Sequence, residues 1–203
     1  MNYIKINNQK IKLTDEQVKQ IQNSFGITNT KLSNIAVGKT FKIGDYEFIV
    51  LEHAKETTAV ILKNLLFENK EFGKNNNYQG SYVDNLCNDF AKEVSKIVGK
   101  DNLIEHTIDL TSDDGLKDYG KVKRFASLLT TDLYRRYVEI LDKHKINKWW
   151  WLATPYSTPT HEDSAWIKCV TPYGILGNYG YIGNIGVRPF CIFNSDIFIS
   201  CEE

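Results

Sequence analysis

Histidines and acidic residues are the side chains of this sequence that could bind a metal ion. The four histidines are dispersed: His53, His106, His144 and His161. Only the run 161–163 combines a histidine with carboxylates, whereas zinc sites need several Cys or His ligands at short spacings. Asp113, Asp114 and Asp118 lack the alternating ligands and terminal glutamate of an EF-hand. We therefore expect no metal and no cofactor, with a calcium site in the 109–118 or 161–163 loop as the alternative.

The nucleophiles of the sequence do not form a catalytic motif. The cysteines are Cys87, Cys169, Cys191 and Cys201, with no C-x-x-C pair. Each lies in an apolar stretch, and apolar burial raises the pKa of a thiol and makes it inert. No G-x-S-x-G or S-x-x-K motif occurs, and the glycines of 174–186 lack the strand-to-helix context of a phosphate loop. The sequence thus predicts a protein that is not an enzyme.

Charge and composition narrow the class of protein further. The 203 residues include 25 basic and 25 acidic side chains, so the net charge is zero. Broad nucleic-acid binding needs an excess of clustered basic residues, and only four of them are arginine. No stretch has the length of a membrane span or the pattern of a signal peptide. We expect a cytoplasmic protein, with signal-free export and virion association as the alternative.

Three consecutive tryptophans indicate the centre of the fold. On a strand, Trp149 and Trp151 would share one face and Trp150 would lie on the other. Both faces of such a strand must be covered by apolar groups. The run Trp149-Trp150-Trp151-Leu152 therefore predicts a central strand between two layers.

Aromatic residues near glycine and proline form the candidate binding surface. The segment Gly177–Asn184 alternates glycine with Tyr179, Tyr181 and asparagine, which is typical of loops that display rigid contact groups. Tyr156 lies in the loop between Pro155 and Pro159. The predicted binding residues are Tyr156, His161, Trp166, Asn178, Tyr179, Tyr181 and Arg188. Packing of the tyrosines over the tryptophan strand is an equal alternative, and Arg188 is expected to bond to loop carbonyls or a buried carboxylate.

The remaining elements are predicted from periodicity and capping residues. Three helices are expected, from Thr14 to Gly26, from Ser81 to Gly99, and from about Thr131 to His144. Strands are predicted at 2–12, 37–51, 57–62, 103–110, 149–152, 166–170, 175–179, 187–193 and 197–201, and loops at 28–34 and 68–80. Runs of strands and helices without β-α alternation indicate an α+β fold with a mainly antiparallel sheet and two or three packed helices.

Two units are expected along the chain. Residues 1–34 would form an N-terminal hairpin and helix, and residues 35–203 a globular domain. The hairpin turn is placed at Asn7-Asn8. The first helix carries a narrow apolar stripe of Val18, Ile21 and Phe25, so it must dock on its own domain, on a partner or on a second copy.

Several motifs resemble an uncharacterised bacterial and phage domain family. They are Gly44-x-Tyr46-x-Phe48, Trp150-Trp151-Leu152-Ala153-Thr154-Pro155 and Gly186-Val187-Arg188-Pro189, within residues 35–200. Relatives commonly read W-W-L-R-S-P, so Ala153 and Thr154 depart from the pattern. The tryptophan strand, glycine-rich hairpin and G-V-R-P ending are also similar to the C-terminal half of C-type-lectin-like domains. These include formylglycine-generating enzymes, in which a pair of late cysteines acts; Cys169 and Cys191 would be the counterparts.

The sequence and this resemblance together favour a recognition module carried by a phage or mobile element. It would bind a protein, or as a second choice a glycan, through loops 155–164 and 177–185. One alternative is an inhibitor of a host defence or regulatory complex. The other is a cysteine- or metal-dependent enzyme related to the formylglycine-generating oxidases.

Overall fold

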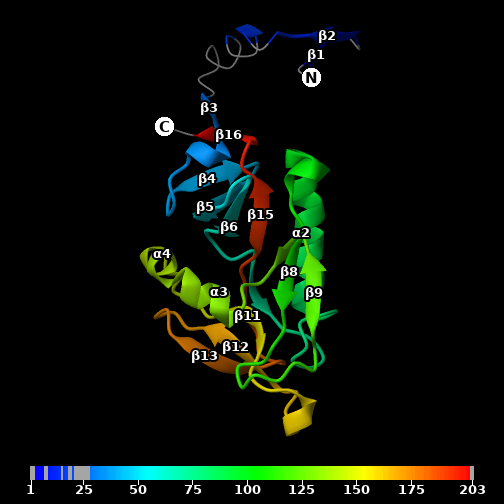
Figure 1. Cartoon of the computed structure of the whole chain (residues 1–203), viewed down its shortest axis with the longest axis vertical. Helices are drawn as coiled ribbons and strands as arrows, with labels where there is room; N and C mark the ends of the chain where they lie inside the picture. Colours follow the sequence, from blue (N-terminus) through cyan, green and yellow to red (C-terminus); the bar gives the residue numbers. More distant parts are fainter. Residues whose placement is uncertain (1–2, 7–8, 15, 18–19, 21–27, 202–203) are drawn as a thin grey trace.

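The structure, a computed structural model, describes residues 3–6, 9–14, 16–17, 20 and 28–201. The described elements include a seven-stranded sheet, a five-stranded sheet, two two-stranded sheets, one long helix and two short α-helices. Figure 1 shows their arrangement. Nearly all strand pairs are antiparallel, with β11 and β14 the parallel exception among the described pairs. The α+β class with mainly antiparallel sheets is therefore confirmed.

The larger sheet has seven strands. In spatial order they are β10 (Ala126–Ser127), β15 (Phe190–Asn194), β6 (Thr57–Leu62), β5 (Tyr46–His53), β4 (Thr40–Ile43), β16 (Phe198–Cys201) and β3 (Thr28–Lys31). The predicted β4–β5 hairpin is present, with Gly44 at its turn in the left-handed region that favours glycine (φ 55°). Phe41, Phe48 and Val60 point from this sheet into a buried cluster against α2.

Helix α2 (Tyr82–Val98) covers one face of the seven-stranded sheet. Its predicted caps are confirmed, because the Ser81 hydroxyl accepts a hydrogen bond from the Asp84 amide and Gly99 follows the last turn with φ 90°. Phe90 and Val94 lie on the face that packs against the sheet. A short 3₁₀ helix, η2 (Lys100–Asn102), and the two-stranded sheet of β8 (His106–Asp109) and β9 (Lys121–Arg124) come next in the chain.

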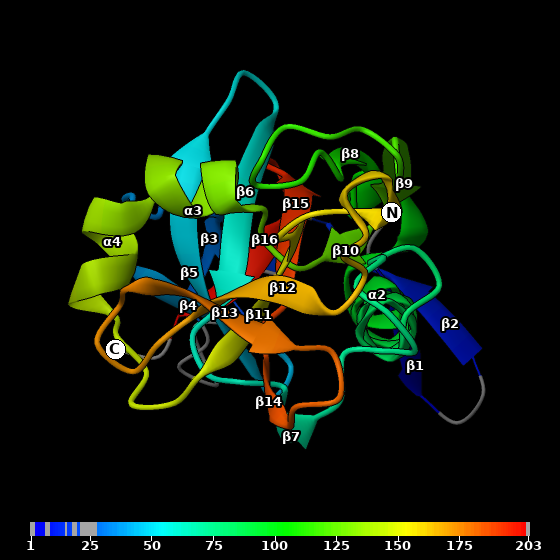
Figure 2. The same ribbon diagram turned by 90° about the horizontal axis from the view of Figure 1, so that it is seen from below.

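The tryptophan run lies in the smaller sheet. The spatial order is β13 (Leu176–Gly180), β12 (Trp166–Val170), β11 (Trp150–Pro155), β14 (Ile185–Val187) and β7 (Phe67–Lys70). Every residue of the central strand β11 is buried. Trp151 packs in the cluster with α2 and the β8–β9 sheet, and Trp150 packs in the cluster with the short helices and the other sheet. A central strand covered on both faces is therefore confirmed for residues 150–152, and β11 lies between β12 and β14 (Figure 2). Trp149, which was predicted as part of this strand, precedes β11 and is 38% exposed.

The third predicted helix is two helices rather than one. Helix α3 (Thr131–Arg136) and helix α4 (Val138–Lys143) are separated by Tyr137, whose backbone leaves the helical region (φ −105°, ψ 11°). The Tyr137 hydroxyl donates a hydrogen bond to Glu52 on β5. The helix is thus interrupted at the residue whose side chain is bonded to the sheet. The apolar periodicity of residues 131–144 does not indicate this interruption.

Several segments differ from the sequence predictions. Residues 28–34 are not a polar link, because β3 pairs with β16, and Leu32 in η1 (Leu32–Asn34) is fully buried. The 68–80 region is only partly a surface loop, since it contains most of β7 and the buried Phe72 and Tyr78. The predicted strand 187–193 is divided between β14 and β15. Pro189 immediately precedes β15, where its missing backbone N–H interrupts no strand pairing.

The N-terminal hairpin consists of β1 (Tyr3–Ile6) and β2 (Gln9–Lys12), which pair as predicted. Thr14 and Gln17 form a capping box, with each side chain bonded to the other residue's amide, at the predicted start of the first helix. The turn at 7–8, the apolar stripe and the end at Gly26 lie outside the described residues. None of the described helices combines the length and apolar character needed to cross a bilayer.

Candidate functional site

The loop from Pro155 to Ala165 leaves the end of the central strand and carries several predicted binding residues. It contains the 3₁₀ helix η3 (Pro159–His161). Buried Asn76 holds both ends of the loop, because its amide nitrogen donates to the carbonyls of Ser157 (3.0 Å) and Trp166 (3.1 Å). The Asn76 oxygen accepts from the Tyr119 hydroxyl at 2.6 Å. Sequence reasoning placed Asn76 in a surface loop, since an Asn-rich run gives no sign that one of its members is buried.

Asp114 fixes the middle of the same loop. Its carboxylate accepts hydrogen bonds from the hydroxyls of Ser112 and Ser157 and lies 3.0 Å from His161 Nδ1. These bonds, with the Ser112 hydroxyl first, hold the pKa of Asp114 well below its usual range. Asp118 adds a second anchor by accepting from the amide and hydroxyl of Thr160. The 111–118 and 157–163 segments are thus joined by short polar contacts.

Two exposed aromatic side chains lie at the two ends of this ordered loop. Tyr156 is 42% exposed and Trp166 is 49% exposed, although the Tyr156 amide is bonded to the Trp166 carbonyl (2.9 Å). Lys168 lies 5.9 Å from the centre of the Tyr156 ring and is paired with Asp113 at 3.1 Å. A hollow of about 400 Å³ beside them is lined by Asp113, Asp114, Tyr156, Ser157, His161 and Asp163.

The other predicted tyrosines lie on the opposite face of the sheet. Trp166 pairs with Gly180 and Ile167 with Tyr179, so strand alternation places Trp166 and Tyr179 on different faces. The Tyr179 ring contacts Trp149 and Trp151, with ring centres 5.7 and 5.9 Å apart. Tyr181 packs against the same buried cluster. The structure therefore separates Tyr179 and Tyr181 from Tyr156 and Trp166, in agreement with the packing alternative, while Asn178 is exposed on β13.

Arg188 is a structural residue and not part of the surface. It is 1% exposed, and its guanidinium donates to the carbonyls of Leu62 (2.8 Å) and Lys63 (3.0 Å). The group also lies over the Trp150 ring, and burial lowers its pKa to about 10. Its inclusion among the binding residues was wrong, whereas the expected bonding to carbonyls is confirmed.

The other arginines are also engaged within the chain. Arg124 forms a two-point contact with buried Asp84, Arg136 pairs with Glu52, and Arg135 lies 3.1 Å from Asp132. A phosphate would have to displace one of these carboxylates, because bidentate recognition uses the same guanidinium nitrogens. The arrangement gives no support to anion binding by arginine.

The described cysteines and histidines do not form a group of metal ligands. Cys87, Cys169 and Cys191 are reduced and buried, and desolvation raises the pKa of Cys87 and of Cys169 to about 12. Cys169 and Cys191 lie in different sheets and different buried clusters. His53, His106 and His144 are bonded to different parts of the fold. Among the described side chains, no group of three His, Cys, Asp or Glu is placed to hold a metal ion.

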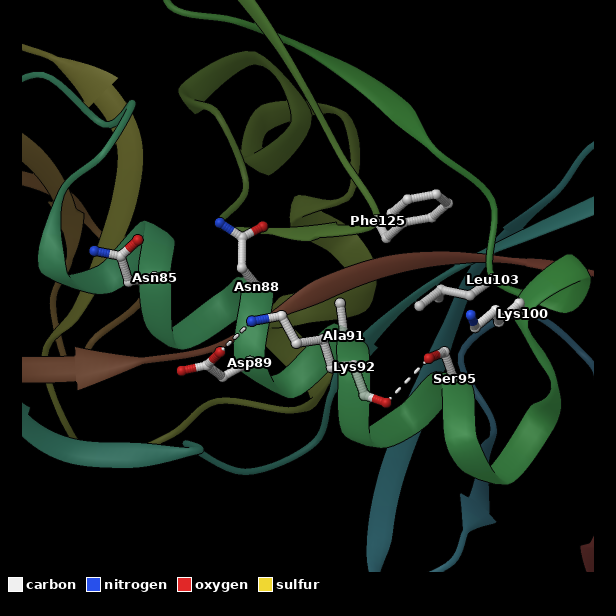
Figure 3. A pocket seen from close by; sticks show the side chains of 9 residues that line it. All are labelled: Asn85, Asn88, Asp89, Ala91, Lys92, Ser95, Lys100, Leu103 and Phe125. Carbon is white, nitrogen blue, oxygen red and sulfur yellow. Dashed lines mark hydrogen bonds and ion pairs between the residues drawn. The ribbon is translucent and has the colours of Figure 1, made fainter.

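A separate groove of about 700 Å³ runs along α2 (Figure 3). The helix contributes Asn85, Asn88 and Lys92, and the exposed Phe125 lies on the opposite rim. Asp89 in this groove is paired with Lys92 at 2.8 Å, so the lining presents no paired nucleophile and base.

Comparisons with known proteins give no match: no family model, no curated protein and no solved structure is significantly similar to the chain. The resemblance to a phage domain family and to lectin-like domains therefore stays a prediction.

Proposed function

We propose that the chain is a non-enzymatic recognition module that binds a protein through Tyr156 and Trp166, with His161 at the edge of the contact. The observation that carries the proposal is the exposure of two aromatic rings at the two ends of a loop that is fixed by hydrogen bonds: Tyr156 at its start and Trp166 at the first position of β12. Exposed tryptophan and tyrosine are the residues that most often dominate protein interfaces. We call Tyr156, His161 and Trp166 the aromatic surface.

Order in the free loop favours binding. Association costs free energy whenever a flexible loop must be fixed, and a loop already held in place avoids much of that cost. Asn76 ties the loop to the region before α2, and Asp114 ties it to the segment after β8. The aromatic surface is therefore presented by groups from three separate parts of the chain.

A protein partner fits better than a glycan. Sugar-binding sites combine an aromatic face with polar groups that are open to the sugar hydroxyls. Here the Asp114 oxygens already accept from Ser112 and Ser157, and an Asp163 oxygen accepts from the Ala165 amide. These carboxylate oxygens already take part in bonds that support the loop, which leaves fewer acceptors for sugar hydroxyls.

The test is affinity isolation from cells of the organism that encodes the chain, followed by quantitative mass spectrometry. We expect one protein to be enriched by the wild type and lost with the Tyr156→Ala and Trp166→Ala double variant. Phe198→Ala is the matched control, because Phe198 is 66% exposed on the other sheet. Equal enrichment by the wild type and the double variant would remove the aromatic surface from the proposal.

The inhibitor hypothesis is the same proposal with a particular partner, and the isolated protein would decide it. A host nuclease or regulator among the enriched proteins would favour an inhibitor carried by a phage or mobile element in the cytoplasm. The enzyme hypothesis has a cysteine-dependent and a metal-dependent form. The cysteine-dependent form requires a reactive thiol, which the raised pKa values of Cys87, Cys169 and Cys191 disfavour. Thiol labelling of the native protein and metal analysis test the two forms: one fast-reacting cysteine or a stoichiometric metal would contradict the proposed function.

A further inference from the structure

Strand β13 forms an exposed edge of the five-stranded sheet (Figure 1). Residues 169–187, which include the whole strand, contain no Asp, Glu, Lys or Arg. Edge strands of natural proteins are normally protected from pairing by charged side chains, proline, bulges or a covering element. β13 has none of these, and its central Asn178 is exposed.

The other sheet edges in the described residues carry charged side chains or are short and covered. β1 and β2 include Lys5, Lys10 and Lys12. β7 carries Glu68 paired with Lys148, and β3 carries Lys31 paired with Asp196. β10 is two residues long, buried and packed against α2. β8 and β9 carry charged side chains, among them Asp109, Lys121 and Lys123. Among these edges, β13 alone is long, exposed and uncharged.

The backbone of β13 offers a regular set of outward groups. Thr171 bonds to Ile175 and Tyr181 bonds to Ala165, so odd-numbered residues from 175 to 181 face β12 in this antiparallel pair. The N–H and C=O groups of Leu176 and Asn178 therefore point away from the sheet, as does the Gly180 N–H. The Gly180 carbonyl accepts from Gly183 instead.

We propose that β13 pairs with β13 of a second copy of this chain, antiparallel and centred on Asn178. In this register each Asn178 N–H donates to the Asn178 carbonyl of the other copy. Each Gly180 N–H donates to the other copy's Leu176 carbonyl. These four bonds use only outward groups that no other described backbone group occupies, which is why the register centred on Asn178 fits.

Side chains of the two strands are complementary in the same register. Tyr179 of one copy lies directly opposite Gly177 of the other, and an aromatic ring over a cross-strand glycine is a stabilising pair. Tyr179 is 38% exposed in the single chain, so its ring has surface left to cover. Because residues 169–187 carry no charge, two identical edges can approach each other without repulsion. A charged strand of another protein would find no opposite charge on this edge.

Pairing of two β13 strands would also affect how the chain binds a partner protein, although the dimer proposal does not depend on the proposed function. A twofold axis perpendicular to the paired strands keeps the same face of both sheets on the same side. The two copies of Trp166 would then lie on one side of a continuous ten-stranded sheet, made from the two five-stranded sheets. Such a dimer would engage a partner that has two matching sites with increased avidity.

The experiment is sedimentation equilibrium of the full chain over a wide concentration range, with charge variants at the proposed axis. We expect the wild type to dimerise. Asn178→Lys and Asn178→Asp each place like charges opposite one another and should weaken the dimer by about tenfold or more. Asn184→Lys is the control, because exposed Asn184 lies beyond β13 and outside the paired strands. Thermal unfolding checks that each variant is folded.

Mixing the Asn178→Lys and Asn178→Asp proteins gives the decisive readout. The opposite charges should restore a dimer that contains one copy of each variant. A wild type that stays monomeric, a dimer unaffected by both Asn178 variants, or a mixture that fails to associate would each overturn the proposal. The Tyr156 and Trp166 double variant separates the two proposals. It should lose partner capture and still form the dimer.

Discussion

Tyr179 can lie on the two tryptophans because Gly183 has no side chain. A Cβ at residue 183 would come within 2.1 Å of the Tyr179 ring. The ring would have to leave its place against Trp149 and Trp151. Glycine in this segment thus serves packing, whereas its pattern in the sequence suggested a loop for display.

Gly183→Ala should therefore destabilise the protein and move Tyr179. We expect a loss of about 1–3 kcal/mol in the free energy of unfolding, as in other overpacked sites, with a change in tryptophan fluorescence. Urea unfolding followed by fluorescence measures both. Gly180→Ala is the control, since a Cβ there meets no atom within 4 Å. Equal stability of the two variants would show that the Tyr179 packing is wrong.

His106 gives the fold a dependence on pH. Its Nε2 lies 2.8 Å from the Ser127 hydroxyl and its ring packs edge-on against Phe190, and desolvation lowers the pKa to about 4. The unfolded chain therefore binds a proton at higher pH than the folded chain does. The stabilisation due to neutral His106 is complete above pH 6.5 and is lost as the pH falls toward 4.

Wild-type stability should fall by up to about 1.4 kcal/mol per pH unit between pH 6.5 and 4 from this group. His106→Gln keeps a polar partner for Ser127 but cannot titrate in this range. Its unfolding free energy should therefore depend less steeply on pH than that of the wild type. Parallel pH curves for the two proteins, measured by urea unfolding, would contradict the role of His106.

At the scale of elements, one ion pair joins helix α2 to strand β9. Asp84 is 1% exposed and accepts two bonds from Arg124 on β9, at 2.7 and 2.6 Å. The Gly80 amide and the Asn88 side chain complete its shell. The sequence gives no sign of this pair, because Arg124 lies 40 residues from Asp84 in a strand that was not predicted.

Arg124→Leu should leave the Asp84 carboxylate buried without its cation. We expect a loss of about 3 kcal/mol in unfolding free energy, since one member of a buried pair is removed. Lys92→Ala breaks the exposed pair with Asp89 and should cost below about 1 kcal/mol. Chemical unfolding of both variants measures the difference. A similar small loss in both would mean that Asp84 is accessible to water.

Elements with strong local signals were predicted, and elements defined by distant contacts were not. Ser81 and Gly99 bound α2 through their own chemistry, and the tryptophan run required a covered strand. Strand β9 reads Lys-Val-Lys-Arg and forms only because β8 and α2 lie beside it. The same limit applies to the candidate site: Tyr156 and Trp166 were found as exposed aromatics, but buried Asn76 was not.

At the scale of the molecule, the central strand β11 connects the two buried clusters to the aromatic surface. Trp150 and Trp151 fix the strand between layers, and the loop that begins at its end carries Tyr156. The chain then passes from the smaller to the larger sheet at Arg188, which bonds to the carbonyls of Leu62 and Lys63. The division into residues 1–34 and 35–203 stays a prediction.

Hydrogen–deuterium exchange of the free protein tests most directly whether the 155–166 loop is a preformed binding surface. The amides of Tyr156, His161 and Ala165 are all bonded within the protein. We therefore expect them to exchange far more slowly than open chain, with faster exchange in Asn76→Ala, which removes the anchor. Exchange of the 155–166 peptide at the rate of an unstructured chain in the wild type would contradict a preformed surface, whatever partner is found.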